Sequence, residues 1–434
     1  MIKDRRLSPA ELAELQEQAH AKRTRVVVTG VGAITPLGFT PDEFWKNLLA
    51  GKSGIDRVTL FDTTAYKTKI AAETKGFDPT KYAIDAKDAR RMGRATLFAI
   101  AAAKGALEDA GFPDGLKEND RAGVLLGTAL GGFPEAIDAH NGFLQKGPDR
   151  LSPFVAAVIL PNMPSFYVAN YYRARGYNST VVTACAAGTH AVGAASEIIR
   201  RGDADIMLTG GADAIISDIV FAAFGVMRAL TTRNDDPQHA SRPFDKNRDG
   251  FVIGEGSAIL VLERLEHAVA RGAKIYAEVL GYATNSDAYH FAAPDPSAHG
   301  ATRVMQAAMR NAGVTTDQID YINAHGTSTP LNDSGETLAI KNVFGERAYH
   351  IPISSTKSMV GHSMGAAGAF ESVACIMTLR EQKIHPTVNY ETPDPVCDLD
   401  YVPNVARDAT VNVCMSNSFG LGGQNASLVL AKYK

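Results

Sequence analysis

The chain has 434 residues, of which 45% are hydrophobic and 21% are charged, and its formal net charge at pH 7 is −3. This composition is that of a globular protein and excludes a disordered or fibrous chain. Because no long block of lysine or arginine is present, the sequence predicts no nucleic-acid and no membrane partner. The longest apolar runs, such as residues 154–160, are far shorter than the roughly 18 residues that span a bilayer.

The first residues predict a polar helical extension over residues 1–23. Ser8 suits the N-cap of this helix, Pro9 its first position, and Glu11 the position three residues after the cap. From residue 24 onward, strand-like and helix-like runs alternate. This alternation predicts an α/β fold in which parallel strands are covered by helices.

Two pairs of segments in the remaining chain resemble each other. Residues 104–128 and 306–327 both read as a helix, a glycine turn, a strand and a Gly-Thr pair. In residues 181–199 and 354–373, a strand turns through small residues into a helix rich in alanine and glycine. Repeated units of this length predict two similar halves, although chance similarity between α/β segments is the alternative.

We place the two halves at residues 24–275 and 276–434. If they pack about a twofold axis, equivalent strand ends meet, and the turn at Cys185 faces the turn that runs from Lys357 to His362. Chemistry would then be assembled from both halves.

Cys185 is the cysteine with the most suggestive surroundings. The β-branched residues 181–183 favour a strand, and the small residues that follow favour a helix, which places Cys185 at the helix start. Free N–H groups and the positive end of the helix dipole favour a thiolate there, and thiolate is the attacking form. The hypothesis is a catalytic nucleophile, and the alternative is a small buried hydrophobic residue.

The other cysteines are Cys375, Cys397 and Cys414, and packing explains Cys375 and Cys414 in their helix-like and strand-like runs. The four cysteines form no C-x-x-C pair and no metal spacing. The start of the chain also lacks the apolar core of a secretory signal. We therefore expect a cytoplasmic protein in a reducing compartment.

Further reactive side chains stand at predicted strand ends, namely His325, Lys357 and His362. Two histidines suggest a metal, but no third ligand lies at a helical spacing, so the sequence predicts no metal site. The glycine-rich residues 416–425 lack the G-x-G-x-x-G register and precede a strand, so no dinucleotide cofactor is expected. Their turn instead predicts backbone N–H groups aimed at a reacting carbonyl, next to Phe419.

Several motifs in one order are similar to those of a known family. They are "TACAAGTHA", "NAHGTSTPLND", "STKSMVGHSMGAAGAFE" and "SNSFGLGG", together with "TGVGAITPLG" and "SRPFDKNRDGFVIGEG" nearer the start. From residue 24 to 434 the chain resembles the β-ketoacyl-[acyl-carrier-protein] synthases, which are condensing enzymes of the thiolase fold. Within that family it is most similar to the elongating type II synthases of bacterial fatty-acid synthesis.

The resemblance implies a thiolase-like α/β fold with α/β/α/β/α layers, a homodimer and no cofactor. It also implies an acyltransferase that condenses a malonyl group, with loss of carbon dioxide, with an acyl chain held on a cysteine. An acyl carrier protein would deliver both the acyl and the malonyl groups. The product would be a 3-ketoacyl chain two carbons longer.

The resemblance further implies a role for each matching residue. Cys185 accepts the acyl group, and His325 and His362 stabilise the enolate that decarboxylation forms. Lys357 supplies a positive field, and Glu371 is its ionic partner. The other expected positions are the oxyanion donors (backbone N–H of Cys185 and Phe419), the gate of the acyl channel (Phe419), the contacts to the pantetheine arm (Thr327 and Thr329), the acyl pocket (Leu130 and Phe224) and carrier docking (Arg228). Apart from the resemblance, the local basic cluster of Lys87, Arg90, Arg91 and Arg94 is expected to attract an acidic carrier, with a solvated helix face as the alternative.

Two residues depart from the family pattern. Leu421 stands where an aromatic residue is often found, and Gln424 stands where threonine is usual. These departures leave the chain-length preference open. A polyketide ketosynthase remains an alternative, as does a non-catalytic partner that resembles a chain-length factor, although Cys185 argues against the latter.

Overall fold

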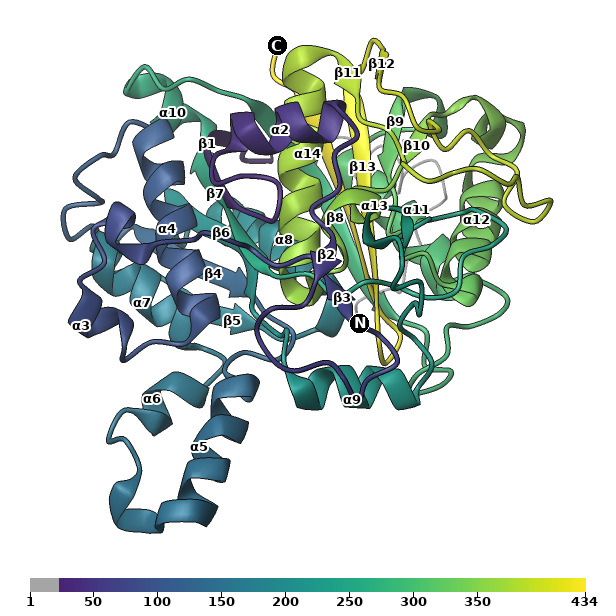
Figure 1. Ribbon diagram of the computed structural model, residues 1–434. Coiled ribbons are helices and arrows are strands. Elements are labelled where there is room, and N and C mark those ends of the chain that lie inside the picture. The colour runs from purple at the N-terminus through teal and green to yellow at the C-terminus, as the bar shows by residue number, and fades with distance from the viewer. Residues whose placement is uncertain (1–22) are drawn as a thin grey trace, which may run out of the picture.

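The computed structural model describes residues 23–434 and is built around one mixed β-sheet (Figure 1). The helical extension expected over residues 1–23 lies, as far as residue 22, outside the described residues. The ten strands follow the order β10-β9-β13-β14-β8-β1-β7-β6-β4-β5. They are β1 (Val26–Ile34), β4 (Ala122–Gly127), β5 (Asn178–Val181), β6 (Ile206–Asp213), β7 (Gly256–Arg264), β8 (Ala277–Ser286), β9 (Tyr321–Asn323), β10 (Ile353–Ser354), β13 (Val413–Gly420) and β14 (Gln424–Lys432).

The sheet consists of two halves with the same topology. β1 and β8 pair antiparallel at its centre, and from them β7-β6-β4-β5 and β14-β13-β9-β10 follow outward in the two directions. β4 is parallel to β5 and β6, and β9 is parallel to β10 and β13, whereas β7 and β14 are antiparallel to both neighbours. The two predicted halves are therefore present, but the expectation of parallel strands holds only for the outer strands. β7 and β14 reverse direction because each returns the chain to the centre beside β1 or β8.

Together with the helices, the two halves of the sheet form the expected α/β/α/β/α layers. One apolar core joins residues of α8, α14 and both halves of the sheet, and separate cores lie under the helices on each outer face. Small residues permit the close contact at the centre: a Cβ atom on Gly368 would lie 2.5 Å from the backbone nitrogen of Thr189. The longer helices are α2 (Pro41–Leu49), α4 (Arg94–Asp109), α5 (Phe133–Lys146), α7 (Met163–Tyr172), α8 (Ala187–Arg200), α9 (Asp218–Val226), α11 (His299–Ala312), α12 (Pro330–Phe344) and α14 (Ala367–Glu381).

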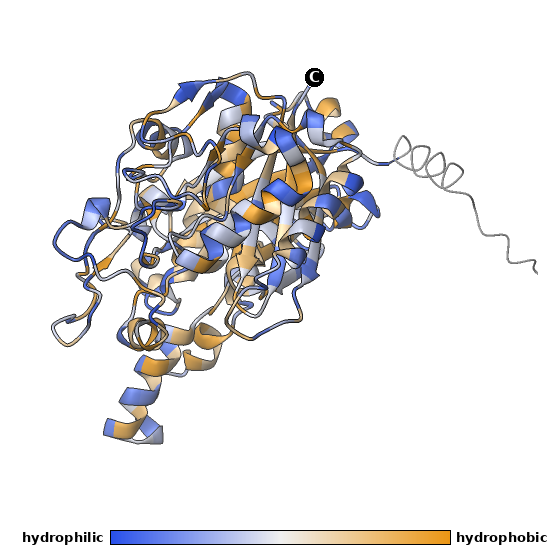
Figure 2. Cartoon of the chain, turned by 90° about the vertical axis from the view of Figure 1, so that its right-hand side faces the viewer, coloured by the Kyte–Doolittle hydropathy of each residue, from blue (hydrophilic) through white to orange (hydrophobic). Residues whose placement is uncertain are grey.

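Shorter elements connect these layers. The short helices are α3 (Ala86–Ala89), α6 (Val155–Ile159), α10 (Leu265–Ala270) and α13 (Lys357–Val360), and two small sheets pair β2 (Asp56–Arg57) with β3 (Ile70–Ala71) and β11 (Lys383–Ile384) with β12 (Arg407–Asp408). Figure 1 shows that α5 and α6 project from the body as a stalk. Hydrophobic residues fill the sheet and also occur on the projecting helices (Figure 2). Within residues 23–434, no helix is both long and apolar enough to cross a membrane.

Candidate active site

Cys185 lies in the 3-10 turn Ala184–Ala186, between β5 and α8. The predicted strand, turn and helix are all present, and the Cys185 side chain is buried. The equivalent turn of the second half, Met364–Ala366, precedes α14 in the same way. The first residue of each turn, Ala184 and Met364, has a φ of +48°, so the two halves repeat even this local backbone strain.

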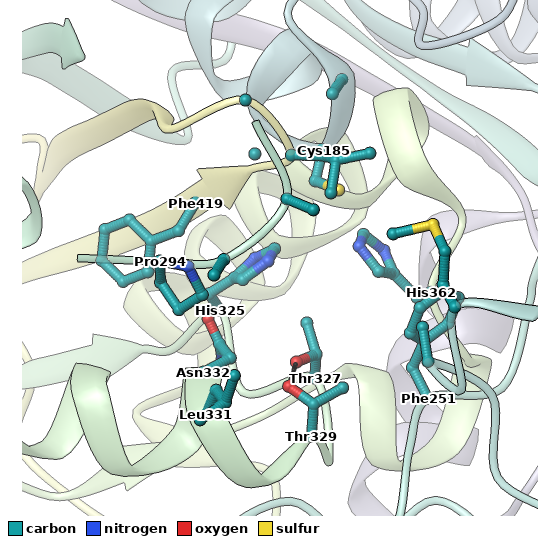
Figure 3. Close-up of a pocket in the computed structure, with 18 of the residues that line it drawn as sticks. Cys185, Phe251, Pro294, His325, Thr327, Thr329, Leu331, Asn332, His362 and Phe419 are labelled. Carbon is teal, nitrogen blue, oxygen red and sulfur yellow. Dashed lines mark hydrogen bonds between the residues drawn. The ribbon is translucent and has the colours of Figure 1, made fainter. Parts of the chain in front are cut away.

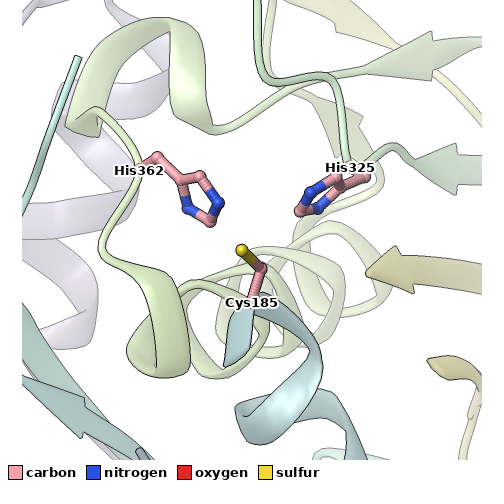
Figure 4. Close-up of side chains that lie close together, drawn as sticks. All are labelled: Cys185, His325 and His362. Atoms are coloured by element: carbon pink, nitrogen blue, oxygen red, sulfur yellow. The ribbon is translucent and has the colours of Figure 1, made fainter. Parts of the chain in front are cut away.

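Cys185, His325 and His362 converge on one point (Figure 4). Their Sγ and imidazole nitrogen atoms lie within 4.8 Å of one another, and all three residues are buried. The two imidazole rings are 5.3 Å apart and nearly perpendicular. The first half thus contributes the thiol and the second half both imidazoles.

Hydrogen bonds assign the tautomer of each histidine. Lys357 Nζ lies 3.2 Å from His325 Nδ1, and an ammonium group can only donate, so this Nδ1 accepts and Nε2 carries the proton. His362 Nδ1 accepts from the backbone N–H of Met364 at 3.3 Å, and its Nε2 is buried without a partner among the described residues. Burial, and in addition the positive charge of Lys357, holds both pKa values well below their usual range. Both imidazoles are therefore neutral and offer Nε2–H donors.

This pair of tautomers does not suit a metal ion. The spacing of the thiol and the two imidazoles would accept a cation, but both Nε2 atoms carry hydrogen. A metal needs a lone pair on the nitrogen that it binds. Moving the proton of His362 to Nδ1 would set two donors against each other at Met364.

A buried ion pair supports His325. Lys357 and Glu371 form a salt bridge with side-chain exposures of 2% and 1%. Ser418 Oγ also donates to Glu371, at 3.4 Å, and burial raises the pKa of this carboxyl. The predicted ionic partners therefore meet, and the positively charged member, Lys357, lies beside Nδ1 of the His325 ring.

The expectation that the helix start would favour a thiolate at Cys185 is wrong in its net direction. Burial raises the pKa of the thiol, and the N–H groups of Leu421 and of Cys185 itself, with the charge of Lys357, lower it only in part. In this buried site, the N–H groups of a short 3-10 turn stabilise the thiolate less than water would. Cys185 is therefore a thiol at neutral pH.

The donor beside the sulfur also differs from the expected one. The backbone N–H of Leu421, two residues after Phe419, is the one that reaches Cys185. The Phe419 ring instead packs edge-to-face on His325, with ring centres 5.7 Å apart (Figure 3). The glycine-rich motif located this hairpin, but the sequence does not show which of its N–H groups faces inward.

Glu336 is a residue that the sequence analysis missed. From α12, its carboxylate accepts hydrogen bonds from the backbone N–H groups of His325, at 2.9 Å, and Gly326, at 2.8 Å. It is buried, and burial raises its pKa to about 7. Glu336 therefore fixes the backbone that carries His325. An acidic residue inside an otherwise ordinary helix pattern gave no local signal of this contact.

The three converging side chains line a cavity of about 570 Å³ (Figure 3). This volume is within the range of small-molecule sites. The predicted residues Leu130, Phe224, Thr327 and Thr329 line it, as do Arg228, Phe251, Met364, Phe419 and Leu421. The hydroxyl groups of Thr327 and Thr329 lie 2.9 Å apart.

The predicted docking residues do not form one group. Arg228 lines the cavity, two residues after the end of α9. Lys87, Arg90 and Arg91 lie on and just after α3, which Figure 1 shows at the left edge of the view, far from α9 at the lower edge. Arg91 also contacts the ring of Phe154 and lies 3.7 Å from Asp88.

Comparison with known families shows the family of the chain. The models of the Beta-ketoacyl synthase N-terminal and C-terminal domains match residues 23–268 and 276–391. The chain belongs to the beta-ketoacyl synthase family. The family resemblance, the thiolase-like fold and the assignment as an acyltransferase of the condensing type are thereby confirmed.

Named relatives cover almost the whole chain. A 3-oxoacyl-[acyl-carrier-protein] synthase 2 of Synechocystis sp. is 49% identical over 96% of this chain and all of its own length. The corresponding enzyme of Staphylococcus aureus is 48% identical over 95% of this chain and all of its own length.

Solved structures of the family superimpose closely. The ishigamide ketosynthase/chain length factor has a TM-score of 0.88 at 40% identity, and a beta-ketoacyl synthase from Burkholderia phymatum has a TM-score of 0.87 at 39% identity. A ketosynthase bound to a type II polyketide acyl-carrier protein has a TM-score of 0.88 at 36% identity. Each covers 95% of this chain and all of its own.

Proposed function

We propose that this beta-ketoacyl synthase is an elongating 3-oxoacyl-[acyl-carrier-protein] synthase of fatty-acid synthesis. The observation that carries the proposal is the convergence of one thiol and two Nε2–H donors in a largely apolar cavity. The names of the relatives that are 48–49% identical support the same activity. The purified protein, given acyl carriers of graded chain length and malonyl carrier, should form 3-ketoacyl products two carbons longer, read by mass. Hydrolysis of the substrates without elongation would contradict the proposal.

The first half-reaction transfers the acyl group to Cys185. The sulfur attacks the thioester carbonyl, the thiol proton leaves, and the carrier thiol departs with a proton. The negative oxygen of the intermediate needs fixed donors. We assign this role to the backbone N–H groups of Cys185 and Leu421, in place of the Phe419 N–H, because the Leu421 N–H reaches the sulfur.

The second half-reaction forms and uses an enolate. With malonyl thioester in the cavity, the Nε2–H groups of His325 and His362 donate to its thioester oxygen, and carbon dioxide leaves. The resulting enolate carbon attacks the acyl carbonyl on Cys185, which forms the new carbon–carbon bond and releases the thiolate to take up a proton. Neutral donors suit this step. They stabilise the negative charge that develops on the thioester oxygen, and they form no ion pair with the malonyl group beforehand.

Lys357 and Glu371 keep this arrangement in place. Because Lys357 donates to His325 Nδ1, it keeps His325 in the tautomer that carries its proton on Nε2, from where it can donate to the substrate. Glu371 compensates the lysine charge, which would be costly alone in a buried site. We propose that Thr327 and Thr329, which line the cavity side by side, contact the pantetheine arm.

Leu130 is proposed to limit the length of the acyl chain. It lines the cavity together with Phe224 and packs in the apolar cluster that includes Cys185 and Met364. Leu130→Phe should lower kcat/KM for the longest accepted acyl chains about tenfold or more and leave short chains unchanged, since added carbons fill the pocket. Steady-state kinetics with graded acyl carriers test this. Val269→Phe, at an exposed position of α10, is the control. The same loss at every chain length in Leu130→Phe would show that Leu130 only supports the packing of the fold.

Arg228 is proposed as the main carrier-docking residue, because it lies at the cavity, where carrier-bound substrate must enter. A local positive charge would attract an acidic carrier although the net charge of the chain is −3. Arg228→Glu should raise KM for carrier-bound substrate about tenfold, more at low salt, and spare a small thioester that needs no carrier.

The paired reversal Arg90→Glu and Arg91→Glu tests the second part of the docking proposal, which includes Lys87. If these residues also guide the carrier, KM should rise in the same carrier-selective way. Equal loss with carrier-bound and small thioesters would show that the arginines support the fold or the site itself.

A homodimer is proposed from two unpartnered features of the described residues. The outer edge of β5 has no further strand beside it. The stalk and the start of α7 carry large exposed apolar side chains, among them Leu144 at 67% and Phe166 at 45%. Sedimentation of the purified protein at micromolar concentration should give twice the chain mass, and a monomer under these conditions would contradict the proposal.

We propose a cytoplasmic location. The four cysteines are free and buried, which fits a reducing compartment. Fractionation of source cells with an antibody against the protein would contradict this if the protein were recovered outside the cytoplasm.

A polyketide ketosynthase is the second candidate. Two of the structures with TM-scores of 0.88 are a ketosynthase/chain length factor and a ketosynthase bound to a hexaketide, at 40% and 36% identity. The fatty-acid assignment is preferred because the relatives named 3-oxoacyl-[acyl-carrier-protein] synthase 2 are closer, at 48–49%. If the purified protein makes several successive additions and the 3-keto groups are retained, the polyketide function would be favoured.

A further inference from the structure

Asp213 is a buried carboxylate for which the proposed mechanism has no use. It is the last residue of β6, it is 0% exposed, and it forms no ion pair among residues 23–434. An isolated buried carboxylate is costly unless hydrogen bonds compensate it. The groups that compensate Asp213 come from two segments that line the cavity.

The first segment is the loop Thr128–Gly131, which follows β4. Thr128 Oγ1 donates to Asp213 Oδ1 at 2.6 Å, and the backbone N–H of Ala129 donates to Oδ2 at 2.8 Å. The N–H of Leu130 makes a longer contact of 3.4 Å to Oδ1. The N–H of Gly131 in turn donates to Thr128 Oγ1, at 3.0 Å. One carboxylate therefore organises the whole loop.

The second segment is the turn that contains Met364 and Gly365, from the other half of the molecule. The N–H of Gly365 donates to Asp213 Oδ2 at 2.7 Å. Its neighbour Met364 lines the cavity, with Sδ 3.7 Å from Cys185 Sγ. Asp213 thus links the backbone of Leu130 to the turn of Met364, and both side chains line the same cavity as the acyl-accepting sulfur.

Close packing joins the two segments, since a Cβ atom on Gly365 would lie 2.5 Å from the backbone nitrogen of Ala129. A Cβ atom on Gly188 would lie 2.6 Å from the carbonyl oxygen of Gly365, and one on Gly211 would lie 2.2 Å from it. The turn of Gly365 is therefore held by α8 and β6 as well as by Asp213. The loop Thr128–Gly131 leads into the projecting α5, and Asp213 accepts hydrogen bonds from the backbone N–H groups of this loop and of Gly365 at the same time.

We propose that Asp213 is a positioning residue that sets acyl-chain selectivity by holding the Leu130 wall of the cavity against Met364. This inference rests on the proposed function, since it assigns a substrate preference to that same site. Burial raises the pKa of Asp213 to about 6, so the carboxylate is mostly ionised, with full acceptor capacity, at pH 7.5. Asp213 contacts the site through the two segments, and its negative charge also helps to raise the pKa of Cys185.

The test compares Asp213→Asn with Thr128→Val by steady-state kinetics on short and long acyl carriers at pH 7.5. The amide turns an N–H₂ group toward backbone donors, and valine removes one donor without changing the side-chain shape. In the asparagine variant, the ratio of kcat/KM values for the preferred and disfavoured chain lengths should fall about tenfold, with a smaller fall in the valine variant. Malonyl decarboxylation, which does not use the acyl wall, should change less than twofold.

Glu73→Gln is the matched control. Glu73 is likewise buried and accepts from Thr59 Oγ1, at 2.6 Å, and from the N–H groups of Thr59 and Leu60, but it does not line the cavity. It should leave the selectivity ratio unchanged. Equal losses at every chain length in both test variants, or an unchanged ratio, would overturn the role of Asp213. The wild-type protein in the same assay tests the proposed function separately, since that function fails if the wild type makes no elongated product.

Discussion

Cys185→Ala is expected to abolish both acyl loading and condensation, with kcat/KM reduced about 10⁴-fold or more, because Cys185 is the only cysteine among the described residues that line the cavity. Cys185→Gln, whose amide resembles an acylated cysteine, should also lose condensation but retain malonyl decarboxylation. Loading is measured as an acyl adduct by mass, and decarboxylation as released carbon dioxide.

Cys414→Ala provides the matched control for this loss. Cys414 is also a free, buried cysteine, but it lies in β13 and packs in the central core. Its alanine variant should lose stability and keep the acyl adduct. Condensation that survives in Cys185→Ala would remove Cys185 from the mechanism.

The raised pKa of Cys185 gives this prediction a pH dependence. A group that is a thiol at neutral pH reacts with iodoacetamide in proportion to its small thiolate fraction. Alkylation of Cys185 should therefore accelerate about tenfold per pH unit between pH 7 and 8.5. A rate that is already constant in this range would show that the thiolate is the resting form.

Replacing His325 or His362 by alanine is expected to slow malonyl decarboxylation by about 10²- to 10³-fold, the usual cost of losing one donor to a developing oxyanion. Loading of Cys185 should fall much less, because its donors are backbone N–H groups. His362→Gln should recover part of the rate, since its amide places an N–H near the position of Nε2–H.

The lowered pKa values of the two histidines fix the expected pH response. A group whose pKa lies well below its usual range stays neutral as the pH falls from 8 to 6. Decarboxylation should therefore show no loss from histidine protonation near pH 6.5.

His190→Ala, in α8 outside the cavity, is the control for the His325 and His362 alanine variants and should keep the wild-type decarboxylation rate. Loading that falls as steeply as decarboxylation would contradict the division of roles.

The sequence predicted the residues of the site better than their exact contacts. Repeated strand, turn and helix units correctly placed Cys185 opposite the turn of Lys357 and His362, because equivalent strand ends meet when two similar halves pack together. The salt bridge between Lys357 and Glu371 followed from the family motif. These features depend on residue type and order, both of which the sequence contains.

Features that depend on orientation and burial were not predictable in the same way. Residues 419–421 span one hairpin end, and only the fold decides that the Leu421 N–H faces Cys185. The direction of the Cys185 pKa shift depends on the balance between lost hydration and nearby hydrogen-bond donors, and this balance is known only once the fold is known. The contacts of Glu336 and Asp213 join segments that lie 10 to 152 residues away in the chain, so no local pattern revealed them.

The proposed mechanism requires that Cys185 carries an acyl group and that a decarboxylated malonyl unit then extends it. The most direct test loads the full-length protein from an acyl carrier, removes the excess, adds malonyl carrier and follows the intact protein and products by mass in one turnover. We expect an acyl adduct on the peptide that contains Cys185, its disappearance on adding malonyl carrier, and equimolar carbon dioxide and 3-ketoacyl product two carbons longer. An adduct on another residue, or an adduct on Cys185 that malonyl carrier does not consume, would contradict the proposed mechanism.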